Sequence, residues 1–178
     1  MDDFTVPKLS EPTEVPKINE GVMAHSKPFC ATPEHQSALG FPGELVDAWH
    51  DKAIAKFGEI LDGQGALSVY MDACVKCGAC TDKCHYFLGT GDPKNMPVAR
   101  QDLMRKIYRR YFTWTGKWLP WLVGAKDLTL EVLDEWYSYF HQCSQCRRCS
   151  VYCPYGIDTA EFSMAAREIM DHIGMGQK

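Results

Sequence analysis

Apolar residues recur at helical spacing in four stretches of the chain, at residues 44–61, 97–112, 127–141 and 158–173. No comparable run alternates apolar and polar residues as a half-buried strand would, so we predict a mainly α fold. The expected buried faces are Val46, Trp49, Ala53, Phe57 and Ile60 in the first helix; Leu103, Met104, Ile107, Tyr108, Tyr111 and Phe112 in the second; Leu133, Trp136, Tyr137 and Phe140 in the third; and Phe162, Ala165, Ala166, Ile169 and Ile173 in the last.

Polar residues and glycines mark where these helices begin and end. Asp127 and Asp158 are suited to cap the third and fourth helices, and Gly63 and Gly174 to end the first and fourth. The polar side of the second helix is strongly basic, so we expect the following residues on or beside its solvent face: Arg100, Arg105, Lys106, Arg109 and Arg110.

The chain before the first helix lacks apolar periodicity and is rich in proline, at Pro7, Pro12, Pro16, Pro28, Pro33 and Pro42. Because proline fixes φ and removes a hydrogen-bond donor, we predict an extended arm over residues 1–43. Such an arm is either disordered or becomes ordered along a partner's surface. The second domain is expected over residues 44–178.

Composition limits the function classes. The 178 residues are 46% hydrophobic and 24% charged with a net charge of −4, which is typical of a soluble globular protein and gives no indication of nucleic-acid binding. The start, from Met1 to Pro12, carries no export pattern. The most apolar stretch, residues 118–125, is too short and too broken by proline to cross a bilayer.

Eight of the nine cysteines form two motifs of the same spacing, C-x₂-C-x₂-C-x₃-C. The first consists of Cys74, Cys77, Cys80 and Cys84, and the second of Cys143, Cys146, Cys149 and Cys153, which Pro154 follows. This spacing is typical of proteins that bind two [4Fe–4S] clusters, in which the fourth cysteine of each motif ligates the other cluster. We therefore expect cluster 1 on Cys74, Cys77, Cys80 and Cys153, and cluster 2 on Cys143, Cys146, Cys149 and Cys84.

Other cofactors fit these motifs less well. Structural zinc normally uses separated pairs of ligands, covalent haem needs C-x-x-C-H, and a Rieske centre needs two histidines in place of cysteines. The linker between the motifs, residues 85–142, is 58 residues long and holds two of the expected helices. It favours an all-helical ferredoxin domain, and the crossed pairing would couple cluster loading to folding.

Several residues near the motifs have two open interpretations. His85 is either a surface residue or a hydrogen-bond donor near a cluster. The basic residues within the motifs either raise a cluster's potential or are solvated surface charges, and they are Lys76, Lys83, Arg147 and Arg148. Cys30 lies alone in the arm and is expected not to be a ligand.

The segment 105–121 mixes aromatic and basic residues, including Tyr108, Arg109, Arg110, Trp118 and Trp121. Such a mixture suits a membrane interface or a protein-binding patch. The alternative is that these aromatic side chains pack in the core of a small helical domain.

Two stretches, residues 84–98 and 145–161, resemble heterodisulfide reductase C/D-type iron–sulfur proteins, most closely the N-terminal ferredoxin part of K subunits of membrane complexes linked to dissimilatory sulfite reductase. Residues 73–175 carry the resemblance. It implies a place on the cytoplasmic face of the inner membrane, with electrons passing between a membrane cytochrome b-type subunit and a catalytic disulfide-reductase half or subunit. A small persulfide- or trisulfide-carrying protein is the implied substrate.

This chain has no adjacent cysteine pair, whereas the catalytic half of such proteins carries Cys-Cys-Gly motifs. Disulfide reduction is therefore expected on a further part of a longer protein or on a separate subunit, and no catalytic residue is assigned here. Two other functions remain open: an iron–sulfur subunit of a flavin-dependent dehydrogenase such as glycolate oxidase, and an iron–sulfur redox sensor that acts through a binding surface.

Overall fold

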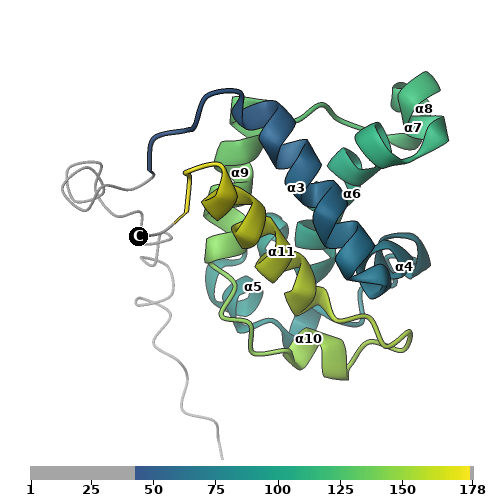
Figure 1. Ribbon diagram of the computed structural model, residues 1–178. Helices are drawn as coiled ribbons and strands as arrows, with labels where there is room; N and C mark the ends of the chain where they lie inside the picture. The colour runs from purple at the N-terminus through teal and green to yellow at the C-terminus, as the bar shows by residue number, and fades with distance from the viewer. Residues whose placement is uncertain (1–42, 177–178) are drawn as a thin grey trace, which may run out of the picture. The chain divides into compact units, whose positions relative to one another are not determined.

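The computed structural model describes residues 43–176. The predicted arm therefore lies outside the described residues, apart from Gly43, and so does Cys30. Within the described range every regular element is a helix and there is no strand, which confirms the prediction of a mainly α fold (Figure 1).

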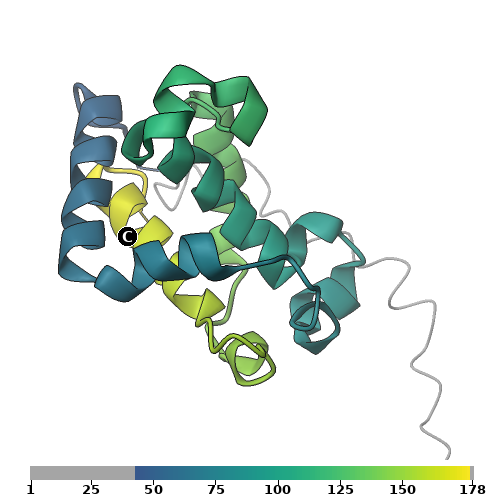
Figure 2. The ribbon, with the colours of Figure 1, turned by 90° about the vertical axis from the view of Figure 1, so that its right-hand side faces the viewer.

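Four long helices form the core of this unit. They are α3 (Trp49–Gly63), α6 (Pro97–Phe112), α9 (Leu130–His141) and α11 (Thr159–His172). Helix α11 contacts α3, α6 and α9 and so lies at the centre of the packing (Figures 1 and 2). The largest fully buried side chains are Trp136, Phe57, Phe140, Phe162, Leu67, Met71, Met104, Ile107, Leu133, Ile157, Ile169 and Met170.

Shorter helices connect these four. They are α4 (Gly65–Ala73), η1 (Thr81–Lys83), α5 (His85–Thr90), η2 (Pro93–Asn95), α7 (Trp114–Trp118), α8 (Pro120–Val123) and α10 (Arg148–Val151). Helix α4 leads directly into the first cysteine motif, and α5 and η2 follow it. Helix α10 lies within the second motif.

The predicted helix boundaries are mostly right. The second helix has the predicted ends, and Asp158 caps α11 by accepting a hydrogen bond from the backbone N–H of Ala160 at 3.0 Å. The third helix begins later than predicted, because the Thr129 hydroxyl caps it through the N–H of Val132, while Asp127 pairs with Arg110 instead. The first helix also starts later, at Trp49.

Two arginines of α6 are buried, contrary to expectation. Arg100 and Arg105 are each 3% exposed, although the periodicity put them on or beside the polar face. The N-terminal half of α6 runs alongside both cysteine motifs, so a position that would face solvent on an isolated helix is covered here.

Among residues 43–176, no helix combines the length and the apolar character that a membrane span requires.

Candidate metal centre

The eight motif cysteines line two separate cavities. Cavity one is lined by Cys74, Cys77, Cys80 and Cys153, and cavity two by Cys84, Cys143, Cys146 and Cys149. Their volumes, open mouths included, are about 350 and 320 Å³. Each cavity therefore takes three cysteines from one motif and the last cysteine of the other motif.

The two motifs adopt the same turn around their middle cysteine. The residues on either side of Cys77 have positive φ, at 57° for Lys76 and 81° for Gly78. The residues on either side of Cys146 match them, at 57° for Gln145 and 58° for Arg147. Left-handed backbone is unfavourable for residues other than glycine, by about 1–2 kcal/mol each. Three such residues in matching positions indicate that the turn is required for the site.

Turns of this kind direct backbone N–H groups into a concave loop, and such loops bind anions and iron–sulfur clusters. In the second motif the N–H of Gln145 donates to the Sγ of Cys143 at 3.4 Å. Three thiols on a loop with inward N–H groups, together with a fourth thiol from the other motif, fit a [4Fe–4S] cluster, which carries net negative charge when thiolates ligate it. The donor set of each cavity therefore fits the cofactor that the spacing predicts.

Within residues 43–176, no three His, Cys, Asp or Glu side chains converge closely enough to hold a single metal ion. The thiolates of a [4Fe–4S] cluster bind four different irons and are more widely spread than ligands of one ion. Burial, with the nearby Cys149 as a second cause, raises the pKa of Cys80 to about 11. Burial also raises the pKa of Cys149. Metal binding to these two thiols must therefore release their protons.

The wall between the cavities is made by the first turns of α6 and α11. Val98 and Gln101 of α6 line cavity one, whereas Pro97 and Arg100 line cavity two. On α11, Thr159 and Ala160 likewise line cavities one and two, respectively. The hydroxyl of Thr159 donates to the Sγ of Cys149 at 2.6 Å and so contacts a ligand of cavity two from the wall of cavity one.

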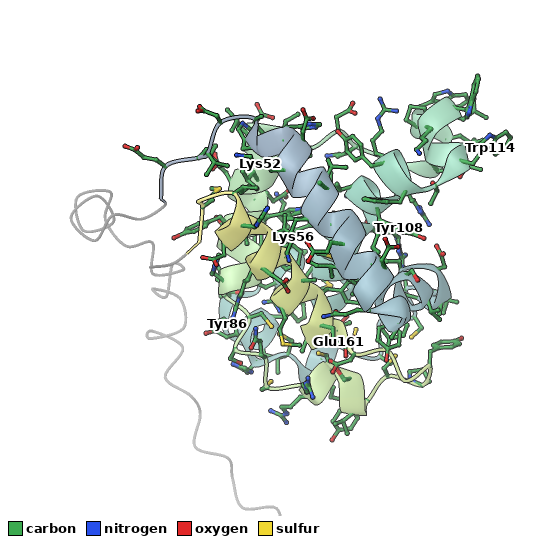
Figure 3. All side chains as sticks on the ribbon, viewed as in Figure 1. Lys52, Lys56, Tyr86, Tyr108, Trp114 and Glu161 are labelled. Atoms are coloured by element: carbon green, nitrogen blue, oxygen red, sulfur yellow. The ribbon has the colours of Figure 1, made fainter. Side chains whose placement is uncertain are left out.

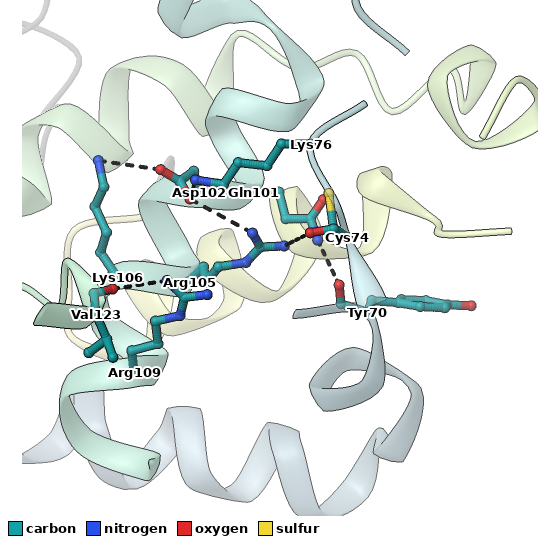
Figure 4. A network of polar contacts seen from close by, with 9 residues as sticks. All are labelled: Tyr70, Cys74, Lys76, Gln101, Asp102, Arg105, Lys106, Arg109 and Val123. Atoms are coloured by element: carbon teal, nitrogen blue, oxygen red, sulfur yellow. Dashed lines mark hydrogen bonds and ion pairs between the residues drawn. The ribbon is translucent and has the colours of Figure 1, made fainter. Parts of the chain in front are cut away.

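A polar network supports cavity one and is drawn in Figure 4. Arg105 donates to the carbonyl oxygen of Cys74 at 3.2 Å, and Gln101 donates to that of Tyr70 at 2.8 Å. Asp102 binds Lys76 at 2.7 Å and lies 4.0 Å from Arg105. Burial alone would raise the pKa of Asp102, but its hydrogen bond to Lys76 and the surrounding cations hold the pKa below its usual value. The carboxylate therefore stays charged beside these cations.

Cavity two is bordered by Arg100. Its Nη2 donates to Oδ1 of buried Asn95 at 2.9 Å, and its Nη1 lies 3.8 Å from the Sγ of Cys84. Its buried Nε has no hydrogen-bond partner among residues 43–176. No carboxylate within residues 43–176 forms an ion pair with Arg100. A buried guanidinium without a counter-ion is costly unless an anion lies nearby.

A second arginine supports the same motif. Arg167 donates to the carbonyl oxygens of Phe140, His141 and Cys143, and so ties α11 to the loop that carries the second motif. Burial lowers the pKa of Arg167, and the neighbouring Arg100 guanidinium lowers it further. Two cations thus lie close together beside cavity two.

The structure also places the residues left open by the sequence. His85 lines cavity two, with its Nδ1 3.9 Å from the Sγ of Cys146 and its Nε2 3.3 Å from the Ser144 hydroxyl. Lys83 lines cavity two and pairs with Asp82, and Arg147 lines it and pairs with Asp158 at 3.2 Å. Arg148 is exposed. The sequence analysis missed the roles of Asn95, Arg100, Thr159 and Arg167, which carry no motif of their own.

Comparisons with known proteins agree with the motifs. A family described as a 4Fe-4S dicluster domain matches residues 70–157. The "Hdr-like menaquinol oxidoreductase iron-sulfur subunit" of Archaeoglobus profundus is 50% identical over 135 residues, which are 76% of this chain and 24% of that protein. The "Hdr-like menaquinol oxidoreductase iron-sulfur subunit 2" of Archaeoglobus fulgidus is 49% identical over 135 residues, again 76% of this chain and 24% of that protein.

More distant relatives have a related description. The D subunit of the dihydromethanophenazine:CoB–CoM heterodisulfide reductase of Methanosarcina barkeri is 28% identical over 106 residues, 60% of this chain and 25% of that protein. The chain thus spans about a quarter of the length of the curated relatives it matches. No solved structure matches it significantly. The resemblance predicted from the two motif-bearing stretches is confirmed: the chain is similar to heterodisulfide reductase-like iron–sulfur proteins, and its residues 70–157 match the 4Fe-4S dicluster domain.

Proposed function

We propose that this chain, a heterodisulfide reductase-like iron–sulfur protein, holds two [4Fe–4S] clusters and relays electrons between a menaquinol-linked membrane partner and a thiol–disulfide centre. Cys74, Cys77, Cys80 and Cys153 would hold cluster 1, and Cys84, Cys143, Cys146 and Cys149 would hold cluster 2. The observation that carries the proposal is the crossed origin of the four thiols in each cavity. When bound, each cluster takes up and gives back one electron.

The residues around the cavities support a relay. The shared wall of α6 and α11 keeps two redox sites adjacent, with only the first turns of two helices between them. Buried Arg100 and Arg105 supply positive charge near the ligands of each site. Cys77 and Cys146 are exposed, so each cavity reaches the surface where a redox partner can approach.

The expected partners follow from the relatives and from the chemistry. Oxidation of one menaquinol releases two electrons and two protons. Reduction of one disulfide to two thiols consumes two electrons and two protons. A cytochrome b-type membrane subunit would supply electrons on the cytoplasmic face of the inner membrane. A catalytic disulfide-reductase half or subunit would receive them and act on a small persulfide- or trisulfide-carrying protein of sulfur metabolism.

The first test is cluster content. Chain purified anaerobically should contain about eight irons and eight acid-labile sulfides, as two four-iron clusters require. Cys30→Ala, which changes the one cysteine outside the motifs, is the control and should keep the full content. Stoichiometric zinc in place of iron, or about four irons, would contradict the proposal.

The second test concerns the relay. Purification of the native complex from detergent-solubilised membranes should recover a haem-containing partner with this chain. Menaquinol analogues should then reduce the clusters of that complex, as followed by visible absorption. A complex with a flavoprotein and without haem would instead support the alternative flavin-dependent dehydrogenase.

A further inference from the structure

The short helices α7 and α8 hold three tryptophans in solvent. We call residues 114–123, which contain both helices, the tryptophan hairpin. Trp114, Trp118 and Trp121 are 75%, 73% and 77% exposed, and Leu119 and Leu122 beside them are also exposed. Figure 3 shows Trp114 pointing away from the ribbon at the edge of the molecule. The interpretation that the aromatic side chains of this segment pack in the core is therefore wrong for the three tryptophans.

The tryptophan hairpin is nevertheless firmly built onto the end of α6. The Thr113 hydroxyl accepts from the N–H of Gly116 and donates to the carbonyl oxygen of Arg109 at 2.7 Å. Arg109 donates to the carbonyl oxygen of Val123 at 2.9 Å, tying the end of α8 to α6. A Cβ at Gly116 would collide with the carbonyl oxygen of Arg109, so the turn depends on glycine. These hydrogen bonds fix the backbone of α7 and α8 in a conformation that leaves the three indoles exposed to solvent.

The charge around the tryptophan hairpin is mainly positive. Residues 106–126 contain five basic residues and no acidic residue, although Arg110 pairs with Asp127 and Lys106 with Asp102; the five are Lys106, Arg109, Arg110, Lys117 and Lys126. Lys117 and Lys126 are exposed at the hairpin and just after it. Exposed tryptophans among lysines and arginines are the composition of elements that lie in the interface of an anionic bilayer.

The position of the tryptophan hairpin argues against a role in electron exchange. Helix α6 has its first turn at the cavities and its last turn at the hairpin, and its 16 residues extend over about 24 Å. In both views α7 and α8 lie at the opposite end of the unit from α10 of the second motif (Figures 1 and 2). A redox partner bound at the hairpin would be far from cavity two, so this surface suits anchoring better than electron exchange with that cavity.

We propose that the tryptophan hairpin docks directly on an anionic lipid bilayer. Trp114, Trp118 and Trp121 enter the interface with Leu119 and Leu122, and Lys117 and Lys126 lie near lipid phosphates. The cavities are then held away from the lipid, on the side open to partner proteins. This attachment is additional to the membrane partner proposed above and does not depend on the clusters being as assigned.

The test uses the full chain with its iron bound, mixed with vesicles of phosphatidylglycerol and phosphatidylcholine or of phosphatidylcholine alone. The chain should sediment with the anionic vesicles, and its tryptophan emission should shift to the blue. Trp118→Ser combined with Trp121→Ser should weaken this binding by more than about tenfold, because the apolar area placed in the interface is lost. Lys117→Gln should weaken it about fivefold, the effect of one basic residue near an anionic surface.

Val69→Ser combined with Leu88→Ser is the matched control, since it removes two apolar side chains that are 61% and 58% exposed elsewhere. The control should bind vesicles like the unchanged chain, and all variants should keep their iron absorption. Failure of the unchanged chain to sediment with anionic vesicles at low salt overturns the proposal. So does an equal loss in the control, or a hairpin variant that loses a co-purifying protein while keeping its vesicle binding.

Discussion

The two cysteine-lined cavities share a backbone turn and differ in the charge that surrounds them. Beside cavity one, Lys76 and Arg105 lie around the ionised Asp102, and Lys76 is half exposed. Beside cavity two, and counting only the described part of the chain, Arg100 is buried without a carboxylate partner and Arg167 binds only backbone carbonyl oxygens. Positive charge that is buried and unpaired acts more strongly than charge that is paired and solvated.

This difference predicts different potentials for the two sites. A nearby cation favours the reduced, more negative form of a cluster and so raises its potential. Cluster 2 should therefore have the higher potential, and an electron shared between the two sites should reside mainly there. Redox titration followed by electron paramagnetic resonance would measure both potentials in one sample.

The largest effect should come from breaking the crossed pairing on which the comparison rests. Cys153→Ala should abolish the signal of cluster 1 and lower the iron content from about eight towards four per chain. Cys80→Ala should remove the same signal, whereas Cys146→Ala should remove the other. If Cys153→Ala and Cys146→Ala abolish the same signal, each motif binds its own cluster and the comparison of the cavities fails.

Removal of the unpaired buried charge should have the next largest effect. Arg100→Gln should lower the potential of cluster 2 by on the order of 100 mV, the size of one charge a few ångströms away at an effective dielectric constant near 20. Arg100→Lys keeps the charge and should restore most of the potential. An unchanged potential in Arg100→Gln, with both signals intact, would show that this guanidinium does not set the difference.

A smaller effect is expected from the hydrogen bond across the shared wall. Thr159→Val removes the hydroxyl that donates to the Sγ of Cys149 and should lower the potential of cluster 2 by roughly tens of millivolts. Thr159→Ser is the control, because it keeps the hydroxyl. A shift of cluster 1 alone would mean that Thr159 acts on the cavity it lines and not through Cys149.

The smallest effect should come from the paired surface charge of cavity one. Lys76→Gln should change the potential of cluster 1 by no more than about 20 mV, because Lys76 is 49% exposed and already bound to Asp102. The same redox titration measures it. A shift as large as that of Arg100→Gln would remove the distinction between paired and unpaired charge.

The sequence predicted those parts of the molecule that depend on local spacing. Cysteine spacing predicted all eight cysteines that line the two cavities, and apolar periodicity predicted α6 with both its ends. Asp158 was a correct cap because it stands directly before an uninterrupted apolar pattern. The prediction of Asp127 as a cap was wrong, because its carboxylate pairs with Arg110 and Thr129 caps the helix instead.

Features that depend on tertiary packing could not be predicted. Arg100 and Arg105 follow the polar rows of α6, and only the placement of the cysteine loops against that helix covers them. For Trp118 and Trp121 the sequence left core packing and a binding patch both open, and the structure decides for exposure because their short helices project from the end of α6. Helical periodicity predicts which residues share a face and does not predict what covers that face.

The shared wall of α6 and α11 has a consequence for how fast the protein could work. The rate of electron tunnelling falls exponentially with distance, so it depends strongly on the separation of the two redox sites. Here the separation is set by the backbone of two helix first turns, which substitution of side chains does not widen. With two clusters bound as proposed, the electron step between them would be set by the helix backbone, while the exposed loops of Cys77 and Cys146 could change to fit other partners without altering that separation.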